Sequence, residues 1–441
     1  TTGGARTCRL PGMTWAPLIV LLTLAAMAGI AALHSRRVRT GEDFALAGRG
    51  LGAGVLVGTL VATWIGTGSI VSNAEFTYET GVAAFVLPLS GLAGMLLLVR
   101  LAPRLRRFGV ATVPEVLGTC YGPAARRLGA VALVGAYLII VSYQYRAGAA
   151  VATRLFPDLD WAPGVWSAAV AVFVILYTAL AGLLSVAWTD VAAGLVILAG
   201  VVGSLVWLGA FGELESLPAS HLDPRGGLGG LGWVNVLLPS FLLILGDANL
   251  MQRFLAAKDE STARRAAVGA FVGLLVVEGA VIGLALMGRA ALGPGLEVPG
   301  HVIIEAAFHL VPPALGLALV TAIVAVILST ADSYLLASST CLVEDLAPGD
   351  GSARRHPAVV VLLGLVALAL SFTSKGFFDI ALYAYTLYGV TITPAFLAAL
   401  LGLRVPRRAV VGGMTAGLST ALVWKLLAEL EALGPVAGVD A

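Results

Sequence analysis

The stretch TAIVAVILSTADSYLLASSTCLVEDL, residues 321–346, decides the fold class of this chain. It is apolar and exceeds the about 20 residues that a helix needs to cross a bilayer. Yet its middle, STADS at 329–333, carries hydroxyls and a carboxyl group, which inside a span usually face a partner or an aqueous cavity. An i, i+3, i+4, i+7 spacing places four residues on one helical face, and these are Val326, Ser329, Thr330 and Ser333. Because oxygen atoms can replace the water shell of a small cation such as Na⁺, the stretch indicates ion-coupled transport.

The composition supports an all-α membrane protein. Hydrophobic residues make up 59% of the 441 residues, charged residues only 12%, and the mean hydropathy is +0.95. A soluble chain carries about twice that charged fraction. The net charge of +2 is spread along the chain, which argues against a nucleic-acid partner. No phosphate-binding loop or nucleophile–histidine set is present, so we do not expect an enzyme.

Hydropathy predicts about twelve transmembrane helices. Their ranges are 13–34, 52–72, 82–102, 128–155, 164–184, 188–210, 233–255, 266–290, 313–345, 357–374, 378–402 and 408–430. With the N-terminus outside, nineteen basic residues, Arg253 among them, fall on the cytoplasmic side and seven on the other, as the positive-inside rule requires. We therefore expect a multi-pass protein of the plasma (inner) membrane.

The spans divide into two sets of five. Residues 52–210 and 233–402 each hold five spans, so the two sets enter the membrane from opposite sides, as in an inverted-topology repeat. Around them we expect an extra N-terminal span and cytoplasmic loop at 1–51, an outer loop at 211–232, and an additional C-terminal span at 403–441.

The first span of each set is expected to be broken. Residues 66–69, Gly-Thr-Gly-Ser, interrupt the span 52–72, and each glycine destabilises a helix by about 1 kcal/mol relative to alanine. The counterpart, 233–255, carries Pro239 and the pair Gly246-Asp247. The glycines could instead allow close helix packing, but unwound segments at matching positions indicate a transporter binding site.

Four motifs make the chain similar to the sodium:solute symporter family, within the LeuT-fold group. They are GRGLGAGVLVGTLVATWIGTGS (48–69), LLSVAWTDVAAG (183–194), GDANLMQRFLAAKDE (246–260) and STADSYLLASSTCLVEDL (329–346). The resemblance covers roughly residues 48–402 and implies a LeuT-type 5+5 inverted repeat with broken helices at 52–72 and 233–255. It also implies solute import by alternating access.

The resemblance implies a sodium site between the broken second span and the ninth span. Its ligands would be the carbonyls and hydroxyls of Ala62, Ile65, Val326, Ser329 and Thr330. The alternative is that the two hydroxyls bond back to carbonyls of their own helix.

A second ion site is implied at Asp190, Ser329, Asp332 and Ser333. Asp332 departs from the family pattern, which often has a hydroxyl there. Three possibilities stay open for the two carboxyl groups: they bind a second Na⁺, one of them holds a proton, or they form a structural pair with Arg146. Asp190 could also simply cap its helix.

The resemblance places the solute beside the two breaks. Trp64, Gly66 and Ser69 match family pocket positions, and the places of further residues on their spans add Tyr143, Arg146, Asp247 and Tyr385. Arg146 inside a span could clamp a carboxylate, whereas the aromatic residues suit a quaternary ammonium. A carboxylate, an amino acid, a choline- or betaine-like solute and a sugar all stay open. Glu278, alone in its span, receives no role.

The sequence as a whole predicts a Na⁺-coupled secondary symporter that imports a small polar organic solute. Asp332 motivates a proton-coupled symporter as an alternative, and a transporter-like membrane sensor domain is a second one. Membrane lipid is the expected surrounding, no nucleic-acid partner is expected, and the sequence assigns no oligomeric state.

Overall fold

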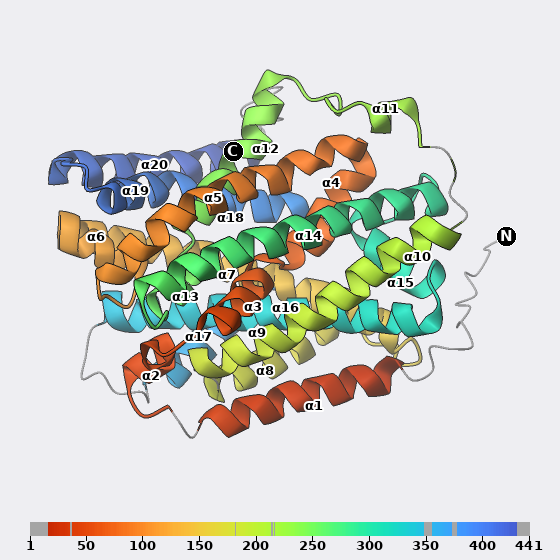
Figure 1. The fold of residues 1–441 in the computed structure, drawn as a ribbon, viewed down its shortest axis with the longest axis horizontal. Coiled ribbons are helices and arrows are strands. Elements are labelled where there is room, and N and C mark those ends of the chain that lie inside the picture. Colours follow the sequence, from red (N-terminus) through yellow and green to blue (C-terminus); the bar gives the residue numbers. More distant parts are fainter. Residues whose placement is uncertain are drawn as a thin grey trace.

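A computed structural model describes residues 16–35, 38–180, 182–212, 215, 217–347, 355–372 and 377–429. Within these ranges the chain is helical, with one isolated backbone bridge between Leu51 and Ala257 and no β-sheet. The predicted all-α fold is therefore confirmed (Figure 1). The α-helices are α1 (Ala16–Ser35), α2 (Gly41–Leu46), α3 (Ala53–Trp64), α4 (Asn73–Thr80), α5 (Val86–Arg107), α6 (Val113–Tyr121), α7 (Pro123–Leu155), α8 (Pro163–Leu180), α9 (Leu183–Ile197), α10 (Gly203–Phe211), α11 (Ala219–Leu222), α12 (Gly230–Gly246), α13 (Ala248–Leu255), α14 (Glu260–Leu292), α15 (Val302–His309), α16 (Pro313–Cys341), α17 (Arg355–Ser371), α18 (Phe377–Thr391), α19 (Thr393–Leu401) and α20 (Arg407–Glu429).

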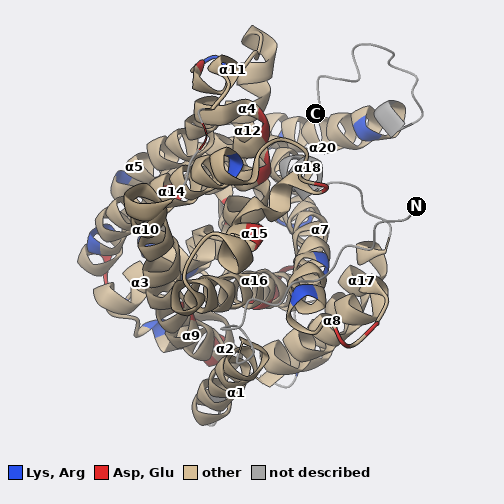
Figure 2. Ribbon diagram, turned by 90° about the vertical axis from the view of Figure 1, so that its right-hand side faces the viewer, with Lys and Arg blue, Asp and Glu red and all other residues tan. Residues whose placement is uncertain are grey.

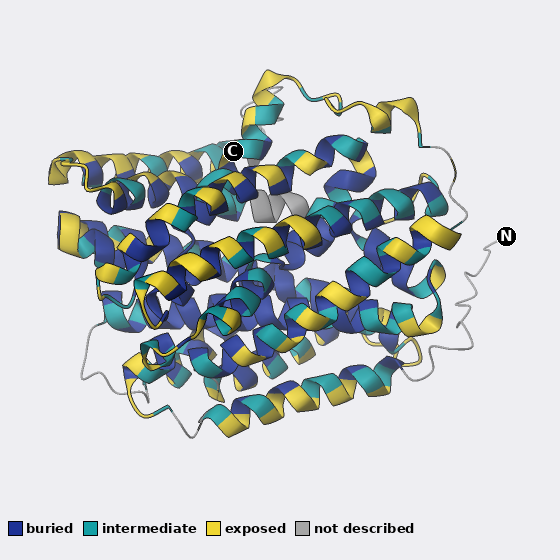
Figure 3. Ribbon diagram, viewed as in Figure 1, coloured by how far each residue is buried: buried dark blue, intermediate teal, exposed yellow. Residues whose placement is uncertain are grey.

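Helix α16 lies at the centre of the bundle. Its first residue is Pro313, at a position where the missing amide hydrogen and fixed φ of proline favour a helix start. Many of its buried residues are Ala, Ser or Thr, which let neighbouring helices approach closely. It packs against α7, α9 and α17. In the 18-residue apolar stretch of its span, 72% of residues are buried within the protein, against 22% in that of α1 and 17% in that of α20, which lie at the periphery (Figure 3).

The long helices run roughly side by side, and charged residues are few along them (Figures 1 and 2). Among the described residues, nine helices are long and apolar enough to cross a membrane, or ten when the pair Tyr383–Thr391 and Thr393–Leu401, bent by 42°, is one span. Two shorter apolar helices, Ala53–Trp64 and Arg355–Ser371, are also present. The count of twelve and the outward N-terminus stay predictions, and residues 1–15 lie outside the described ranges.

Both expected breaks are present. Helix α3 ends at Trp64, and Ile65 leaves the helical region at ψ 81°, before a π-helical turn, η2 (Gly68–Ser72), leads into α4. Helix α12 ends at Gly246, and Asp247 has a non-helical ψ of 107° before α13 begins. Pro239 lies inside α12 and does not end it. The glycine positions therefore located the breaks, and the proline did not.

Candidate sodium and solute sites

The break after α3 frees two backbone carbonyls. In a continuous helix the Gly66 amide would donate to the Ala62 carbonyl and the Ser69 amide to that of Ile65. Here the Gly66 amide donates to the Trp64 carbonyl (2.8 Å), and the Ser69 amide donates to the Gly66 carbonyl (3.1 Å). The Ala62 and Ile65 carbonyls thus lose their helical donors, although both residues are fully buried. A buried carbonyl requires a partner, and a cation can serve as one.

Thr330 on α16 lies directly against this break. A Cβ atom placed on Gly66 would lie only 2.9 Å from Thr330 Oγ1. That hydroxyl is buried and has no hydrogen-bond partner among the described residues, so it does not bond back to its own helix. Freed carbonyls facing an unpartnered hydroxyl fit a small cation such as Na⁺.

Ser329, the other predicted hydroxyl ligand, donates a hydrogen bond to Oδ1 of Asp190 on α9. It too does not bond to a carbonyl of α16. Ser329 therefore connects the face where Thr330 meets the break to a second, charged cluster, and Val326 is fully buried one turn earlier on α16.

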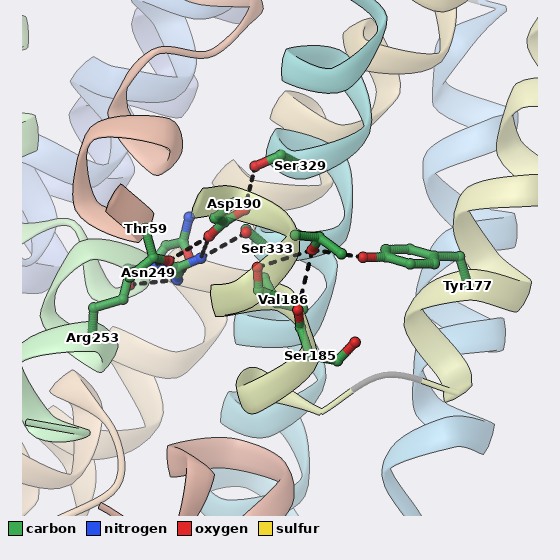
Figure 4. A network of polar contacts seen from close by, with 10 residues as sticks. Thr59, Tyr177, Ser185, Val186, Asp190, Asn249, Arg253, Ser329 and Ser333 are labelled. Atoms are coloured by element: carbon green, nitrogen blue, oxygen red, sulfur yellow. Dashed lines mark hydrogen bonds and ion pairs between the residues drawn. The ribbon is translucent and has the colours of Figure 1, made fainter. Parts of the chain in front are cut away.

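The charged cluster is centred on Arg253 of α13 (Figure 4). Its guanidinium group is fully buried and pairs with Asp190, with 3.2 Å between Nη2 and Oδ2. The same nitrogen donates to Ser333 Oγ at 2.7 Å, and Nε donates to Thr59 Oγ1 at 3.2 Å. Thr59 in turn donates to Asp190. A single guanidinium group thus joins α3, α9, α13 and α16.

Arg253 has two features that the sequence did not predict. The sequence counted it among the basic residues of the cytoplasmic span ends and loops, and in the structure its side chain is fully buried within the bundle. It is also the basic partner of Asp190, a role considered for Arg146. Asp190 is the eighth residue of α9, and its side chain bonds to residues of other helices. It therefore does not cap the start of α9. The signal for Arg253 was present in the motif GDANLMQRFLAAKDE, but its place near a span end favoured a solvated position.

Asp332 is the fourth member of the second predicted ion site. It is fully buried, and neither carboxyl oxygen has a hydrogen-bond partner among the described residues. Asp190, Ser329 and Ser333 are brought together by direct bonds through Arg253 and Asp190. The charges of Asp190 and Arg253 also act on the Asp332 carboxyl group, so this group of charges contains two carboxyl groups and one guanidinium group.

A cavity lies beside the break. The cavity volume is about 40 Å³, enough for a few water molecules. Its walls come from both broken helices, from α5, α14, α16 and α18, and the lining residues are Trp64, Gly68, Ser69, Asn73, Leu87, Pro88, Ser240, Leu243, Glu278, Tyr334 and Tyr385. Three of the predicted solute residues, Trp64, Ser69 and Tyr385, line this cavity.

The remaining predicted solute residues do not line the cavity. Gly66 faces Thr330, and the Tyr143 hydroxyl lies 3.9 Å from a Cβ placed on Gly68. Asp247 accepts hydrogen bonds from Tyr137 and Tyr334, and its carboxylate accepts the Asn249 amide at 2.9 Å. It therefore caps α13, as an aspartate at a helix start does. Arg146 is partly exposed on α7 and is not a lining residue.

The fold and the site together define a multi-pass membrane transporter with LeuT-type broken helices. A family model described as the sodium:solute symporter family matches residues 44–418. The chain belongs to the sodium:solute symporter family. This membership identifies a transporter and not an enzyme, and it supports the predicted use of Na⁺ as the coupling ion.

The curated relatives include proline transporters. The high-affinity proline transporter PutP of Bacillus subtilis (strain 168) is 26% identical over 426 residues, which cover 88% of each chain. The sodium/proline symporter of Salmonella typhimurium is 29% identical over 67% of this chain and 63% of that protein. That of Escherichia coli (strain K12) is 26% identical over 65% of this chain, and the match spans 62% of its length.

Solved structures support the fold. A Na⁺-coupled sialic acid symporter in a substrate-bound outward-open state has a TM-score of 0.74 at 16% identity, over 92% of this chain and 98% of that one. A nucleobase-cation-symport-1 family transporter has a TM-score of 0.59 at 14% identity, over 88% of this chain and 95% of that one. These similarities extend across nearly the whole chain and confirm the LeuT-type architecture.

Gly66→Ala tests the contact between the break and α16. The added methyl group would lie 2.9 Å from Thr330 Oγ1, so we expect the Na⁺ concentration for half-maximal thermal stabilisation to rise about tenfold, equivalent to about 1.4 kcal/mol. The measurement is thermal unfolding of purified protein in NaCl, with KCl matching the ionic strength. Gly54→Ala is the control, because it lies in α3 before the break and its added Cβ would have nothing within 4 Å. An unchanged Na⁺ requirement in Gly66→Ala would exclude Na⁺ binding at this contact.

Thr330→Ala and Ser329→Ala test the two hydroxyl ligands. Each removes one oxygen, and we expect each to raise the Na⁺ requirement about tenfold or more, since a contact with a charged group, as in a charged hydrogen bond, contributes about 1.5–3 kcal/mol. The control is Thr321→Ala, because that hydroxyl of α16 donates to the Leu317 carbonyl at 2.8 Å. If all three variants need the same Na⁺ concentration as the parent, the hydroxyls are not ligands.

Proposed function

We propose that this protein is a Na⁺-coupled symporter that imports a small polar organic solute by alternating access. Na⁺ would bind between the freed carbonyls of Ala62 and Ile65, the Val326 carbonyl, and the hydroxyls of Ser329 and Thr330. The observation that carries this proposal is the buried, unpartnered Thr330 Oγ1 facing the break at Gly66. A cation there removes the cost of leaving buried oxygen atoms without partners.

Ion binding would prepare the solute cavity. The cation bridges α16 and the end of α3, which fixes the segment that continues into η2 and the cavity wall at Ser69. The solute would bind beside it, and rocking of one set of helices against the other would open the site to the cytoplasm. The membrane potential contributes about 2.3 kcal/mol per charge per 100 mV. The plasma membrane, with the N-terminus outside, is the location we propose.

The relatives favour an amino-acid-like solute. Those described as proline symporters are 25–29% identical to this chain, a level at which the fold persists while the solute can differ. L-Proline is therefore the first solute to test. The cavity lining combines aromatic rings with a small set of polar side chains, the kind of lining that small-molecule sites have.

Uptake into proteoliposomes tests the proposal. An inward Na⁺ gradient should drive accumulation of radiolabelled solute, beginning with L-proline, and an equal K⁺ gradient should not. Stabilisation of the purified protein by NaCl over KCl measures ion binding without any solute, since a ligand that binds only the folded state stabilises it. Solute accumulation that is equally strong without Na⁺, or the absence of Na⁺ stabilisation, would contradict Na⁺ coupling.

Asp332 keeps a proton-coupled symporter as the second candidate. One guanidinium group balances one of the two carboxyl groups in the Arg253 cluster, so a proton or a second cation would neutralise the other. We favour a proton on Asp332, because both its oxygens lack partners among the described residues and a neutral acid is less costly to bury than a carboxylate.

Asp332→Asn distinguishes these possibilities, since asparagine resembles the protonated acid. With a permanent proton on Asp332, the variant should keep Na⁺-driven uptake and the parent's Na⁺ requirement within about twofold, well under the tenfold that 1.4 kcal/mol would give. A second bound Na⁺ would instead appear as reduced cooperativity of the Na⁺ dependence in the variant. Uptake driven by a pH gradient alone in the parent, and lost in the variant, would establish proton coupling.

A further inference from the structure

Glu278 is a buried acid that neither the sodium site nor the Arg253 cluster uses. It lies in the middle of α14, is only 1% exposed, and faces the cavity beside the break. Ser69 donates a hydrogen bond to its Oε1 at 2.6 Å, and the Asn73 amide donates to Oε2 at 3.2 Å. Both donors are uncharged. Among the described residues, no Lys, Arg or His lies within ion-pair distance of this carboxyl group.

The other walls of the cavity make Glu278 its charge-determining group. Of the described residues that line it, Glu278 is the one acid, and none is basic. Trp64, Tyr334 and Tyr385 add three aromatic side chains to the lining of the same cavity, and the faces of such rings attract cations. A carboxylate and aromatic rings around one small space form an environment that is favourable for positive charge and unfavourable for an anion.

We propose that Glu278 determines specificity by binding a positively charged nitrogen of the solute. The solute class is then a small zwitterion or organic cation, such as an imino acid, an amino acid or a quaternary ammonium compound. Neutral sugars and simple carboxylates are excluded. This inference rests on the proposed function, because it gives the solute class of the same transport site.

The energetics favour this assignment over a purely structural one. An isolated carboxylate buried in protein costs several kcal/mol unless it is paired. Two neutral hydrogen bonds offset part of that cost, and a ligand cation offsets the rest. Ser69 and Asn73 belong to the segment after the break, so the carboxyl group also fixes the position of that segment. Glu278 can thus position the break and bind the solute at once.

The test compares pairs of probes that differ in one positive charge. L-Proline is matched with N-acetyl-L-proline, which lacks the charged nitrogen, choline with its uncharged carbon analogue, and D-galactose represents sugars. Thermal shift and calorimetry with the full-length protein, in saturating NaCl, measure binding of each probe. We expect stabilisation by at least one cationic or zwitterionic probe and none by its uncharged partner.

Glu278→Gln then separates charge from structure. Glutamine can still accept from Ser69 or Asn73, so the broken segment should keep its position, but the negative charge is lost. We expect at least about a tenfold weaker affinity for the charged probe, as for a buried pair that loses one partner. The preference for the charged probe over its uncharged partner should also shrink, which a merely structural role would not cause. Glu297→Gln, on an exposed loop, is the matched control.

The two proposals fail in different ways. If NaCl does not stabilise the parent protein, the symporter proposal fails. If NaCl stabilises parent and Glu278→Gln alike, but galactose or an uncharged partner binds best, only the role of Glu278 is overturned. Equal affinity of parent and variant for a charged probe overturns it as well, and so does stabilisation by Na⁺ with binding of no charged probe.

Discussion

Gly66 and Thr330 lie so close together that no larger residue than glycine fits between the broken span and α16 without movement. This contact is where an interrupted helix meets an intact one. The interruption releases the carbonyls of Ala62 and Ile65, and the intact helix presents a hydroxyl that has no other partner among the described residues. Neither element alone forms a cation site, because a continuous helix satisfies its own carbonyls and one hydroxyl cannot replace a hydration shell. Their juxtaposition depends on the small residues that let α16 pack centrally.

The Arg253–Asp190 pair holds the neighbouring helices in register. A fully buried pair is a weak source of net stability, but removing one partner typically costs about 3–5 kcal/mol, because the other charge is left unpaired. Here the guanidinium group also bonds to Thr59 and Ser333, so α3, α9, α13 and α16 share one polar centre. Such a network specifies which faces of these helices meet. It also puts a permanent cation within the second predicted ion site, beside two of its residues.

The sequence predicted the parts of the fold that follow from local chemistry. Long apolar runs, the glycine cluster after Trp64 and the Gly246-Asp247 pair identified the helices and both breaks. It did not predict which side chains pair across the bundle, because that depends on the rotation of each helix. Arg253 was therefore only counted among the basic residues of the cytoplasmic span ends and loops, and Glu278 received no role. For Asp247, the sequence indicated a position at a break, but it did not indicate that the hydroxyls of Tyr137 and Tyr334 donate hydrogen bonds to its carboxylate.

Two neighbouring stripes on α16 connect the ion site to the solute cavity. Ser329 and Ser333, four residues apart, bond to the Asp190–Arg253 pair. Thr330 and Tyr334, also four residues apart, face the break and the cavity. Residues at i and i+4 lie on the same side of a helix, so a displacement of α16 moves both stripes together. A displacement of α16 therefore moves the cavity wall at Tyr334 and the Thr330 oxygen at the proposed Na⁺ position together, which is a physical route for coupling ion and solute.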